Sequence, residues 1–238
     1  MAKRAVRSKR RRKGPSVVQR IRRALLRAGL VLVLAVVGII GLGTVVNPIV
    51  TPYVVSERWR LGSVTREWVP LEQMAPVMAL AAVAAEDANF CLHWGLDLAA
   101  IRQAIDAGAA RGASTISQQT VKNVYLWHGR SYPRKALEAL LTPVLEAIWS
   151  KRRIVEVYLN VAEFDEGVFG VGAAARHYFG VSASGLSDTQ AARLAAILPD
   201  PKGRSASQPS DFVQRRARAI LSGAATIRKD GRAACFES

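Results

Sequence analysis

Residues 111–123 read RGASTISQQTVKN, and this stretch indicates how the middle of the chain folds. Thr115 is followed three residues later by Gln118, which is the spacing of a capping box, so a helix should begin near Ser114. The Gly-rich approach to that helix exposes backbone N–H groups beside hydroxyl and amide side chains. The segment is therefore a candidate site for a phosphate or a sugar.

Helical patterns continue on both sides of this segment. Apolar residues recur at spacings of three and four in PVMALAAVAAED, from Pro76, and in LAAIRQAIDAGAA, from Leu98. Pro133 suits the first turn of another helix, which should kink or break at Pro143, and residues 154–159 should continue that helix or begin a new one.

Two further helices are expected toward the C-terminus. Ser187 and Gln190 repeat the capping-box spacing, and Ser210 is suited to cap the last helix. No alternating strand pattern of convincing length appears in the chain. The sequence therefore predicts a mainly α fold with a single helical domain after the N-terminal region.

The first 50 residues contain a basic run followed by an apolar run. Residues 29–46 carry no charge, and roughly 20 residues rising about 1.5 Å each span a hydrocarbon core of roughly 30 Å. A cleaved signal peptide would have a shorter apolar region and an Ala-x-Ala site, and a buried core helix would rarely be so uniformly apolar. We predict a single transmembrane helix at residues 28–50, with an uncleaved signal-type segment as the alternative.

The net charge of +16 belongs mostly to the basic run. Of the 34 Lys and Arg side chains, 12 lie in residues 3–27, which leaves 22 against 18 acidic side chains elsewhere. The charge is thus explained by orientation at a membrane and attraction to anionic lipids, and no nucleic acid is expected as a partner. We expect residues 1–27 in the cytoplasm, a juxtamembrane segment without helical periodicity at 51–69, and an extracytoplasmic domain at 70–238.

Three more segments carry polar side chains that a plain helical domain would not need. Glu86 and Asp87 follow an apolar helix in EDANFCLHWG, where buried charge is costly unless it is paired or used. Arg134 and Glu138 share a helix face, which alone indicates only a surface ion pair. KRRIVEVYLN, at 151–160, should be mostly scaffold with its apolar side chains toward the core. Two carboxylates near clustered cations suit glycosyl transfer from a phosphate leaving group.

Taken in order, EDANFCLHWG, RGASTISQQTVKN, RKALEALL and KRRIVEVYLN resemble the successive motifs of the peptidoglycan glycosyltransferase family. The resemblance covers roughly residues 70–220, and the short length with one anchor is similar to the family's monofunctional members. It implies a lysozyme-like α fold with a large lobe, a smaller membrane-proximal lobe and a cleft between them. It also implies lipid II as substrate at the bacterial cytoplasmic membrane, with undecaprenyl pyrophosphate released as the glycan strand grows.

The resemblance also implies roles for single residues. Glu86 would be the general base that deprotonates the 4-hydroxyl of the acceptor sugar, and Glu138 would be a second carboxylate near the pyrophosphate. Burial at the end of an apolar helix should raise the pKa of Glu86 toward the range of a useful base. Cationic side chains would hold the pyrophosphate, namely Lys122, Arg130, Arg134 and Lys135. Polar side chains would line the cleft, namely Ser114, Gln118, Gln119 and Asn123.

Cofactors, partners and cysteines are less strongly indicated. No cofactor is required by the sequence, and although the resemblance allows Mg²⁺ or Mn²⁺, no ligand cluster identifies a site. Expected partners are lipid II, the nascent glycan strand and membrane lipids, with wall-synthesis or division proteins as further candidates. Cys91 and Cys235 both fall in the external domain, where an oxidising compartment permits a disulfide, and two separate thiols are the alternative. His93 is expected to be structural, and Asp165-Glu166 replaces a turn that more usually contains glycine in the family.

Two other classes of function remain open. A lytic enzyme of lysozyme-like fold could also use a buried glutamate, but cleavage needs no pyrophosphate clamp, so the cations within residues 122–135 favour synthesis. A single-pass scaffold protein would need no carboxylate at Glu86. A bifunctional penicillin-binding protein is disfavoured because the sequence contains no Ser-x-x-Lys.

Overall fold

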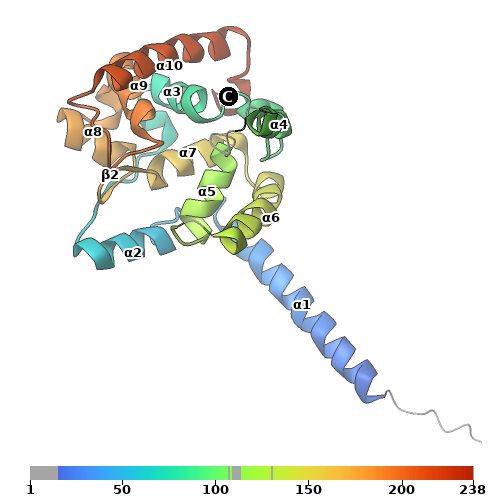
Figure 1. Ribbon diagram of the computed structural model, residues 1–238. Coiled ribbons are helices and arrows are strands. Elements are labelled where there is room, and N and C mark those ends of the chain that lie inside the picture. The colour runs from blue at the N-terminus through green and yellow to red at the C-terminus, as the bar shows by residue number, and fades with distance from the viewer. Residues whose placement is uncertain (1–15, 107, 109–113, 130, 238) are drawn as a thin grey trace, which may run out of the picture. The chain divides into compact units, whose positions relative to one another are not determined.

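The computed structural model describes residues 16–106, 108, 114–129 and 131–237. The chain forms two compact units, Met1–Ile39 and Ile40–Ser238. Most of helix α1 (Val17–Leu42) belongs to the first unit, and its last turn belongs to the second (Figure 1).

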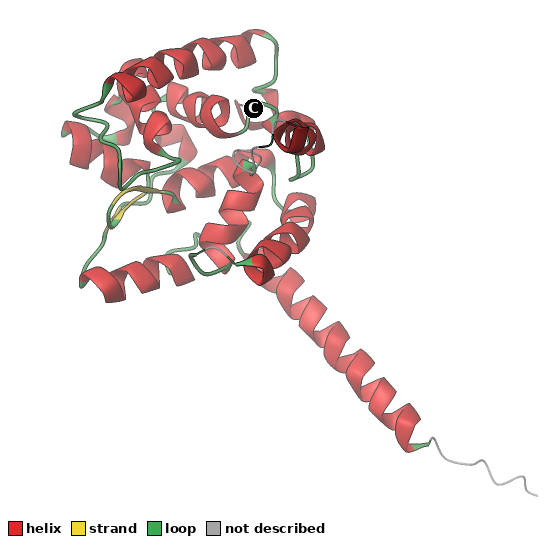
Figure 2. Ribbon diagram, viewed as in Figure 1, coloured by secondary structure: helices red, strands yellow, loops and turns green. Residues whose placement is uncertain are grey.

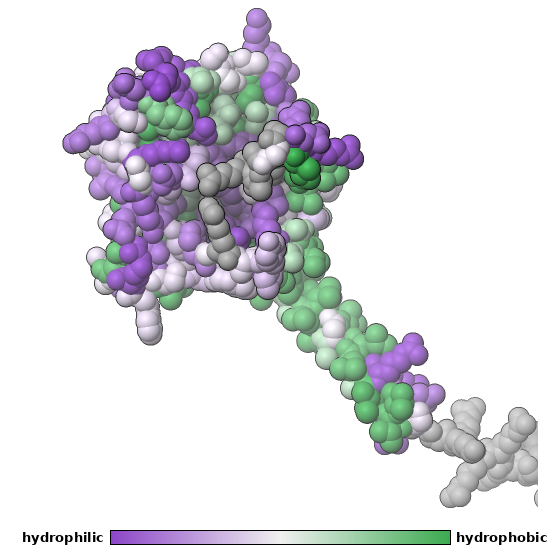
Figure 3. Space-filling view, in the orientation of Figure 1, coloured by the Kyte–Doolittle hydropathy of each residue, from purple (hydrophilic) through white to green (hydrophobic). Residues whose placement is uncertain are grey.

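Helix α1 differs in its bounds from the helix predicted at 28–50. It begins at Val17, and the basic residues from Arg20 to Arg27 are helical as well, because Arg side chains are good helix formers. It ends at Leu42, beside Gly43, and Pro48 follows before the predicted end. The helix is long and apolar enough to cross a membrane, and Figure 3 shows its mainly hydrophobic surface.

The second unit is built mainly from helices, which confirms the predicted mainly α class (Figure 2). After α1 the helices are α2 (Pro52–Leu61), α3 (Pro76–Glu86), α4 (Leu98–Asp106), α5 (Ile116–Tyr125), α6 (Tyr132–Ile148), α7 (Lys151–Val161), α8 (Val171–Phe179), α9 (Asp188–Ile197), α10 (Asp211–Lys229) and α11 (Ala234–Glu237). Short 3-10 turns are η1 (Leu71–Gln73), η2 (Phe90–Leu92) and η3 (Ala183–Gly185). The strands are β1 (Thr65–Arg66), β2 (Glu163–Asp165) and β3 (Val168–Phe169), which form one sheet in the order β1-β3-β2.

The helices of the second unit pack in two groups that meet at α7. Helices α3, α9 and α10 pack against one another, whereas α5 packs against α2, α6 and α7 (Figure 1). Helix α7 also contacts α3, so it connects the two groups. Ile154, Val157 and Tyr158 are at most 1% exposed, which confirms that the apolar face of this segment lies in the core. The arrangement leaves the ends of α3, α5 and α6 near one another in space.

Several local predictions are confirmed at their residues. Thr115 and Gln118 form a capping box at the start of α5, and Ser187 and Gln190 form another at the start of α9. Ser210 accepts a hydrogen bond from the backbone at the start of α10. These caps satisfy amide groups that the first helical turn leaves without partners, which explains why they could be read from sequence.

Other local predictions are wrong. Of the kink or break expected at Pro143, the break does not occur, since α6 continues through Pro143 to Ile148 and packs against α5. The segment 51–69 was expected to lack helical periodicity, but it contains α2. Thr51 caps this helix and Pro52 begins it, so the sequence contained a helix start although its apolar residues show no clear periodicity. The turn after Asp165-Glu166 does use glycine, since Gly167 adopts a φ of 73°.

Cys91 and Cys235 are joined in a disulfide. Of the two alternatives that the sequence left open, the structure therefore contains the bridged one. The bond connects η2 with α11, across 144 residues of sequence.

Candidate active site

A cavity of about 710 Å³ brings together residues from distant parts of the second unit. Its lining combines three carboxylates with amide, hydroxyl, cationic and apolar side chains, namely Glu86, Glu138, Asp200, Gln119, Ser114, Lys122, Arg134, Lys135, Arg204, Leu198 and Pro199. Figure 3 shows a mainly hydrophilic, hollowed face on this unit. A polar cavity of this kind suits a charged, sugar-containing ligand.

Glu86 is the last residue of α3, a helix whose preceding turns are buried among apolar side chains. Its side chain is only 12% exposed, and burial raises its pKa. The amide of Gln119 donates a hydrogen bond of 2.9 Å to Oε2, and this bond together with the charges of Arg216 and Lys122 opposes the rise. Glu86 is thus a carboxylate with increased proton affinity at the edge of an open cavity.

Gln119 is itself oriented by a second hydrogen bond. The hydroxyl of Tyr158 on α7 donates to Oε1 of Gln119 over 3.3 Å, which leaves the amide N–H groups facing Glu86. Tyr158 is 1% exposed, so this support is fixed by the core. The buried scaffold helix therefore sets the position of the carboxylate through one intermediate side chain.

Glu138 lies in a different environment from Glu86. Nη1 of Arg134 is 2.6 Å from Oε2 of Glu138, and Nζ of Lys135 bonds the other oxygen. Lys135 also donates to Ser114 Oγ over 3.0 Å. Because Glu138 is 3% exposed and both oxygens accept from cations, the pair is a buried clamp and not the surface ion pair that spacing alone indicated. Glu138 is placed to hold cations toward the cavity.

Lys122 interacts electrostatically with Glu86 and Glu138. It follows Gln119 by one helical turn on α5 and lines the cavity with Glu86 and Glu138. Burial lowers the pKa of Lys122, while the negative charges of Glu138 and Glu86 oppose that change. Its ammonium group is therefore poorly hydrated and available to an anionic ligand.

The remaining predicted residues have mixed positions. Gln118 is 4% exposed and its side chain completes the capping box, so it does not line the main cavity. Asn123 lines an adjoining cavity of about 410 Å³ that shares Gln119 and Lys122 with the main one. Arg130 lies outside the described residues.

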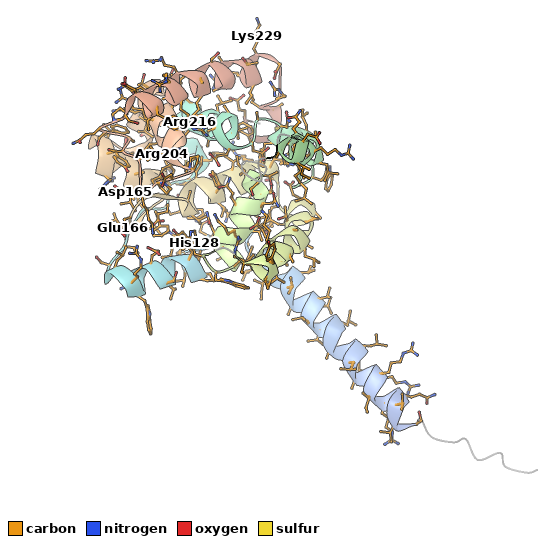
Figure 4. All side chains as sticks on the ribbon, in the orientation of Figure 1. His128, Asp165, Glu166, Arg204, Arg216 and Lys229 are labelled. Carbon is orange, nitrogen blue, oxygen red and sulfur yellow. A yellow bond between two sulfur atoms is a disulfide. The ribbon has the colours of Figure 1, made fainter. Side chains whose placement is uncertain are left out.

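Sequence reasoning missed several residues of this region. Arg216 on α10 approaches Glu86 to 3.9 Å and donates to the carbonyl of Ala85 over 3.3 Å. Arg204 lines the main cavity from the loop after α9, and Figure 4 places both arginines on the α10 side of the domain. Basic residues recur along RRARAIL, so the arginine that faces Glu86 could not be selected from the sequence alone.

The adjoining cavity has its own polar group, which the sequence also did not indicate. The rings of Tyr53 and His128 stack with centroids 3.8 Å apart, and burial lowers the pKa of His128 to about 4. Glu163 accepts from the Tyr53 hydroxyl and lies 3.5 Å from Nζ of Lys202. His128 is hence a neutral ring near neutral pH, and Figure 4 shows it on the side of α2 and α5.

Asp87 and His93 tie the loop after Glu86 to the start of α5. His93 Nε2 lies 2.8 Å from Oδ1 of Asp87, and Oδ2 of Asp87 accepts from the backbone N–H of Ile116 over 3.0 Å. This is the structural role expected for His93. Among the residues that the structure describes, no group of three or more His, Cys, Asp or Glu side chains could hold a metal ion. With Asp87 and Glu138 engaged by donors and cations, these side chains do not fit Mg²⁺ or Mn²⁺ by themselves.

Comparison with known proteins assigns the chain to a family. A family model described as Transglycosylase matches residues 54–225. The chain is 59% identical over 238 residues to a biosynthetic peptidoglycan transglycosylase of Jannaschia sp. (strain CCS1), with 99% of each chain covered. It is 52% identical over 170 residues to the protein of that name from Pseudomonas fluorescens (strain SBW25), covering 70% of this chain and 71% of the relative. A relative of the same name from Caulobacter vibrioides is 42% identical over 226 residues, which covers 93% of this chain and 99% of the relative.

Proposed function

Because the chain belongs to the transglycosylase family and is a peptidoglycan glycosyltransferase of cell wall synthesis, we propose that it polymerises lipid II into glycan strands and releases undecaprenyl pyrophosphate. Its helical second unit fits the lysozyme-like domain of that family. The observation that carries the proposal is one cavity in which two glutamates, Glu86 and Glu138, have different surroundings. Glu86 is buried beside a neutral amide, and Glu138 is held by two cations.

Glu86 supplies the base in the proposed reaction. Its carboxylate takes the proton of the acceptor 4-hydroxyl as the oxygen attacks the anomeric carbon of the donor sugar. The bond between that carbon and the pyrophosphate oxygen breaks, and its electron pair leaves with the phosphate. Gln119 keeps Oε2 oriented, since its amide donates to that oxygen over 2.9 Å.

The cations on α5 and α6 receive the leaving group. Lys122, Arg134 and Lys135 line the same cavity as Glu86, and Glu138 fixes the last two. Positive groups held in place before the reaction stabilise the charge that develops on the pyrophosphate oxygens. Arg130 is proposed as a fourth cation, and Ser114 as a hydroxyl on the same wall.

The N-terminal region is proposed to anchor the enzyme. Helix α1 is long and apolar enough to span a membrane, and basic side chains precede and begin it. Because Lys and Arg are retained in the cytoplasm, residues 1–27 would lie inside and the second unit outside the cytoplasmic membrane. Membrane lipids and the growing strand would then be its immediate surroundings.

The pH dependence of the reaction should report on Glu86. The base must be ionised, and burial raises its pKa, so kcat/KM should fall on acidification at a pH above about 4.3, the ordinary value for glutamate. In Arg216→Gln the falling limb should move to higher pH, because the charge of Arg216 lowers the pKa of Glu86. Arg215→Gln, an exposed neighbour, is the matched control. Two results would contradict the role of Glu86 as the base: an acidic limb of kcat/KM at or below the ordinary pKa of glutamate, or a limb that does not move in Arg216→Gln.

Loss of Lys122 should affect the donor more than the fold. Lys122→Ala removes one preorganised cation, so kcat/KM for lipid II should fall about 100-fold. The melting temperature should change little, because the lost packing is offset by relief from burying an ammonium group. Lys229→Ala, at an exposed residue of α10, should retain full activity. Unchanged polymerisation by Lys122→Ala would remove this residue from the pyrophosphate site.

Purified protein incubated separately with lipid II and with finished sacculi tests the proposed function. Polymer from lipid II and no soluble fragments from sacculi are expected. Fragments from sacculi without polymer would identify a lytic enzyme. Activity on neither substrate, from protein shown to be folded, would support a scaffold protein.

A further inference from the structure

The last residues of the chain return to the loop that follows Glu86. Helix α10 ends at Lys229, Gly231 turns the chain at a φ of 78°, and α11 covers Ala234–Glu237. Cys235 of α11 is bonded to Cys91 of η2. Residues 230–237, which we call the C-terminal strap, therefore join the loop covalently only five residues after Glu86.

Noncovalent contacts reinforce the disulfide. Nη1 of Arg232 donates to the carbonyl of Ala88 over 3.2 Å. The rings of Phe90 and Phe236 have centroids 6.2 Å apart, and both side chains are at most 1% exposed. The strap thus contacts the loop at a backbone carbonyl, an aromatic ring and a sulfur atom.

The strap is itself fixed to the rest of the domain. Arg152 of α7 donates to the carbonyl of Phe236 over 3.2 Å, and α11 packs against α7. Arg228 of α10 pairs with Glu237 at 3.1 Å. A segment that is held by α7 and α10 can limit the movement of a loop bonded to it.

The loop has a direct bearing on the position of Glu86. Glu86, Asp87, Ala88 and Asn89 line a cavity of about 230 Å³ together with Ser114 and other residues, so the backbone after Glu86 forms part of the wall beside that carboxylate. At the start of the loop, Oδ2 of Asp87 accepts a hydrogen bond from the backbone N–H of Ile116, which begins α5. The strap and α5 thereby hold this loop from two directions.

We propose that the C-terminal strap positions Glu86 for proton transfer, and that opening the Cys91–Cys235 bond slows turnover of the folded enzyme. The proposal rests on the function given above for Glu86. The disulfide holds the Cα atoms of Cys91 and Cys235 5.7 Å apart, and the loop that it tethers begins directly after Glu86. Displacement of a reacting group by as little as about 1 Å can lower turnover markedly. Cys91 and Cys235 are positioning residues in this scheme, since neither lines the main cavity.

The experiment compares oxidised wild type with the double variant Cys91→Ser/Cys235→Ser. In the variant, kcat on lipid II should fall about tenfold while KM stays within about twofold, because the cations of the main cavity do not touch the strap. Dithiothreitol should lower the wild-type kcat to the same level and leave the variant unchanged. The dithiol supplies two electrons and two protons, the protein gains two thiols, and the reagent leaves as a cyclic disulfide. Reoxidation should restore the wild-type rate.

Amide hydrogen exchange gives a readout that does not depend on lipid II. Exchange at residues 87–92 should become about tenfold faster on reduction, with circular dichroism unchanged. Faster exchange in a protein that never polymerises lipid II would refute the proposed function and leave the mechanical role of the strap intact. Unchanged exchange, or an unchanged kcat in folded variant despite a lower melting temperature, would overturn the positioning role.

Arg232→Gln provides a second variant should the double variant fail to fold. It removes the contact with Ala88 and retains the disulfide, so kcat should fall about threefold with KM little changed. Arg218→Gln, at an exposed residue of α10, should keep the wild-type kcat. Equal kcat values for Arg232→Gln and Arg218→Gln would overturn the proposal.

Discussion

Glu86→Gln is expected to lower the rate of lipid II polymerisation about 1,000-fold, which is within the range that general-base catalysis contributes. Glutamine has nearly the shape of glutamate and can still contact Gln119, but it cannot accept the proton of the acceptor hydroxyl. The measurement is kcat on lipid II for protein shown to be folded. Glu72→Gln is the matched control, since its side chain is 64% exposed and lies outside the main cavity.

The stability of Glu86→Gln should move in the opposite direction from its activity. Burial raises the folded-state pKa of Glu86, so any stabilisation from this group is complete below the unfolded value and is lost as the pH rises through the folded value. Near neutral pH the buried, ionised carboxylate therefore lowers the stability of the folded state, and glutamine removes this destabilisation. The variant should melt at the same or a higher temperature at neutral pH, and this advantage should disappear at a pH below about 4. A variant that keeps more than a tenth of wild-type turnover would contradict the role of Glu86 as the base.

Glu138→Ala should impair both folding and catalysis. Removing one partner of a buried ion pair leaves the other charge without compensation, and Arg134 is only 8% exposed, so the free energy of unfolding should fall by about 3 kcal/mol. Turnover should fall about 100-fold in the fraction that remains folded, because Arg134 and Lys135 lose the carboxylate that holds them in place beside the cavity. Denaturant unfolding and kcat on lipid II measure the two effects.

An exposed ion pair supplies the comparison for Glu138. Arg176 and Glu67 lie 2.7 Å apart, with side chains 64% and 37% exposed, and Glu67→Ala should cost less than about 1 kcal/mol. A fully stable but inactive Glu138→Ala protein would indicate that Glu138 acts on the substrate directly. A destabilised protein with normal turnover would mean that the clamp serves only the fold.

The parts of the structure that could be predicted depend on local chemistry. Two helix starts could be predicted from capping boxes, formed by Thr115 with Gln118 and by Ser187 with Gln190. The hydrogen bonds of a capping box lie within the first turn of its own helix. The placement of Glu86 beside an apolar helix end is local in the same way. These features can be read without knowing which helices become neighbours.

The parts that could not be predicted depend on tertiary contacts. Spacing alone could not show that Arg134 and Glu138 are buried, because burial is decided by the helices packed around them. The contact between Arg216 and Glu86 joins residues 130 apart in the chain, and the pairing of Tyr53 with Glu163 is similarly remote. The prediction for Gln118 failed for a local reason. The family resemblance implied that its side chain lines the cleft, but that side chain is engaged in the capping box of α5.

The most direct test of the central claim follows both products of the lipid II reaction in wild type and Glu86→Gln side by side. Wild type should release one undecaprenyl pyrophosphate for each glycosidic bond formed, and Glu86→Gln should form both products at about a thousandth of that rate. Pyrophosphate release without glycan polymer, or polymer formed by Glu86→Gln at a rate near that of wild type, would contradict that claim.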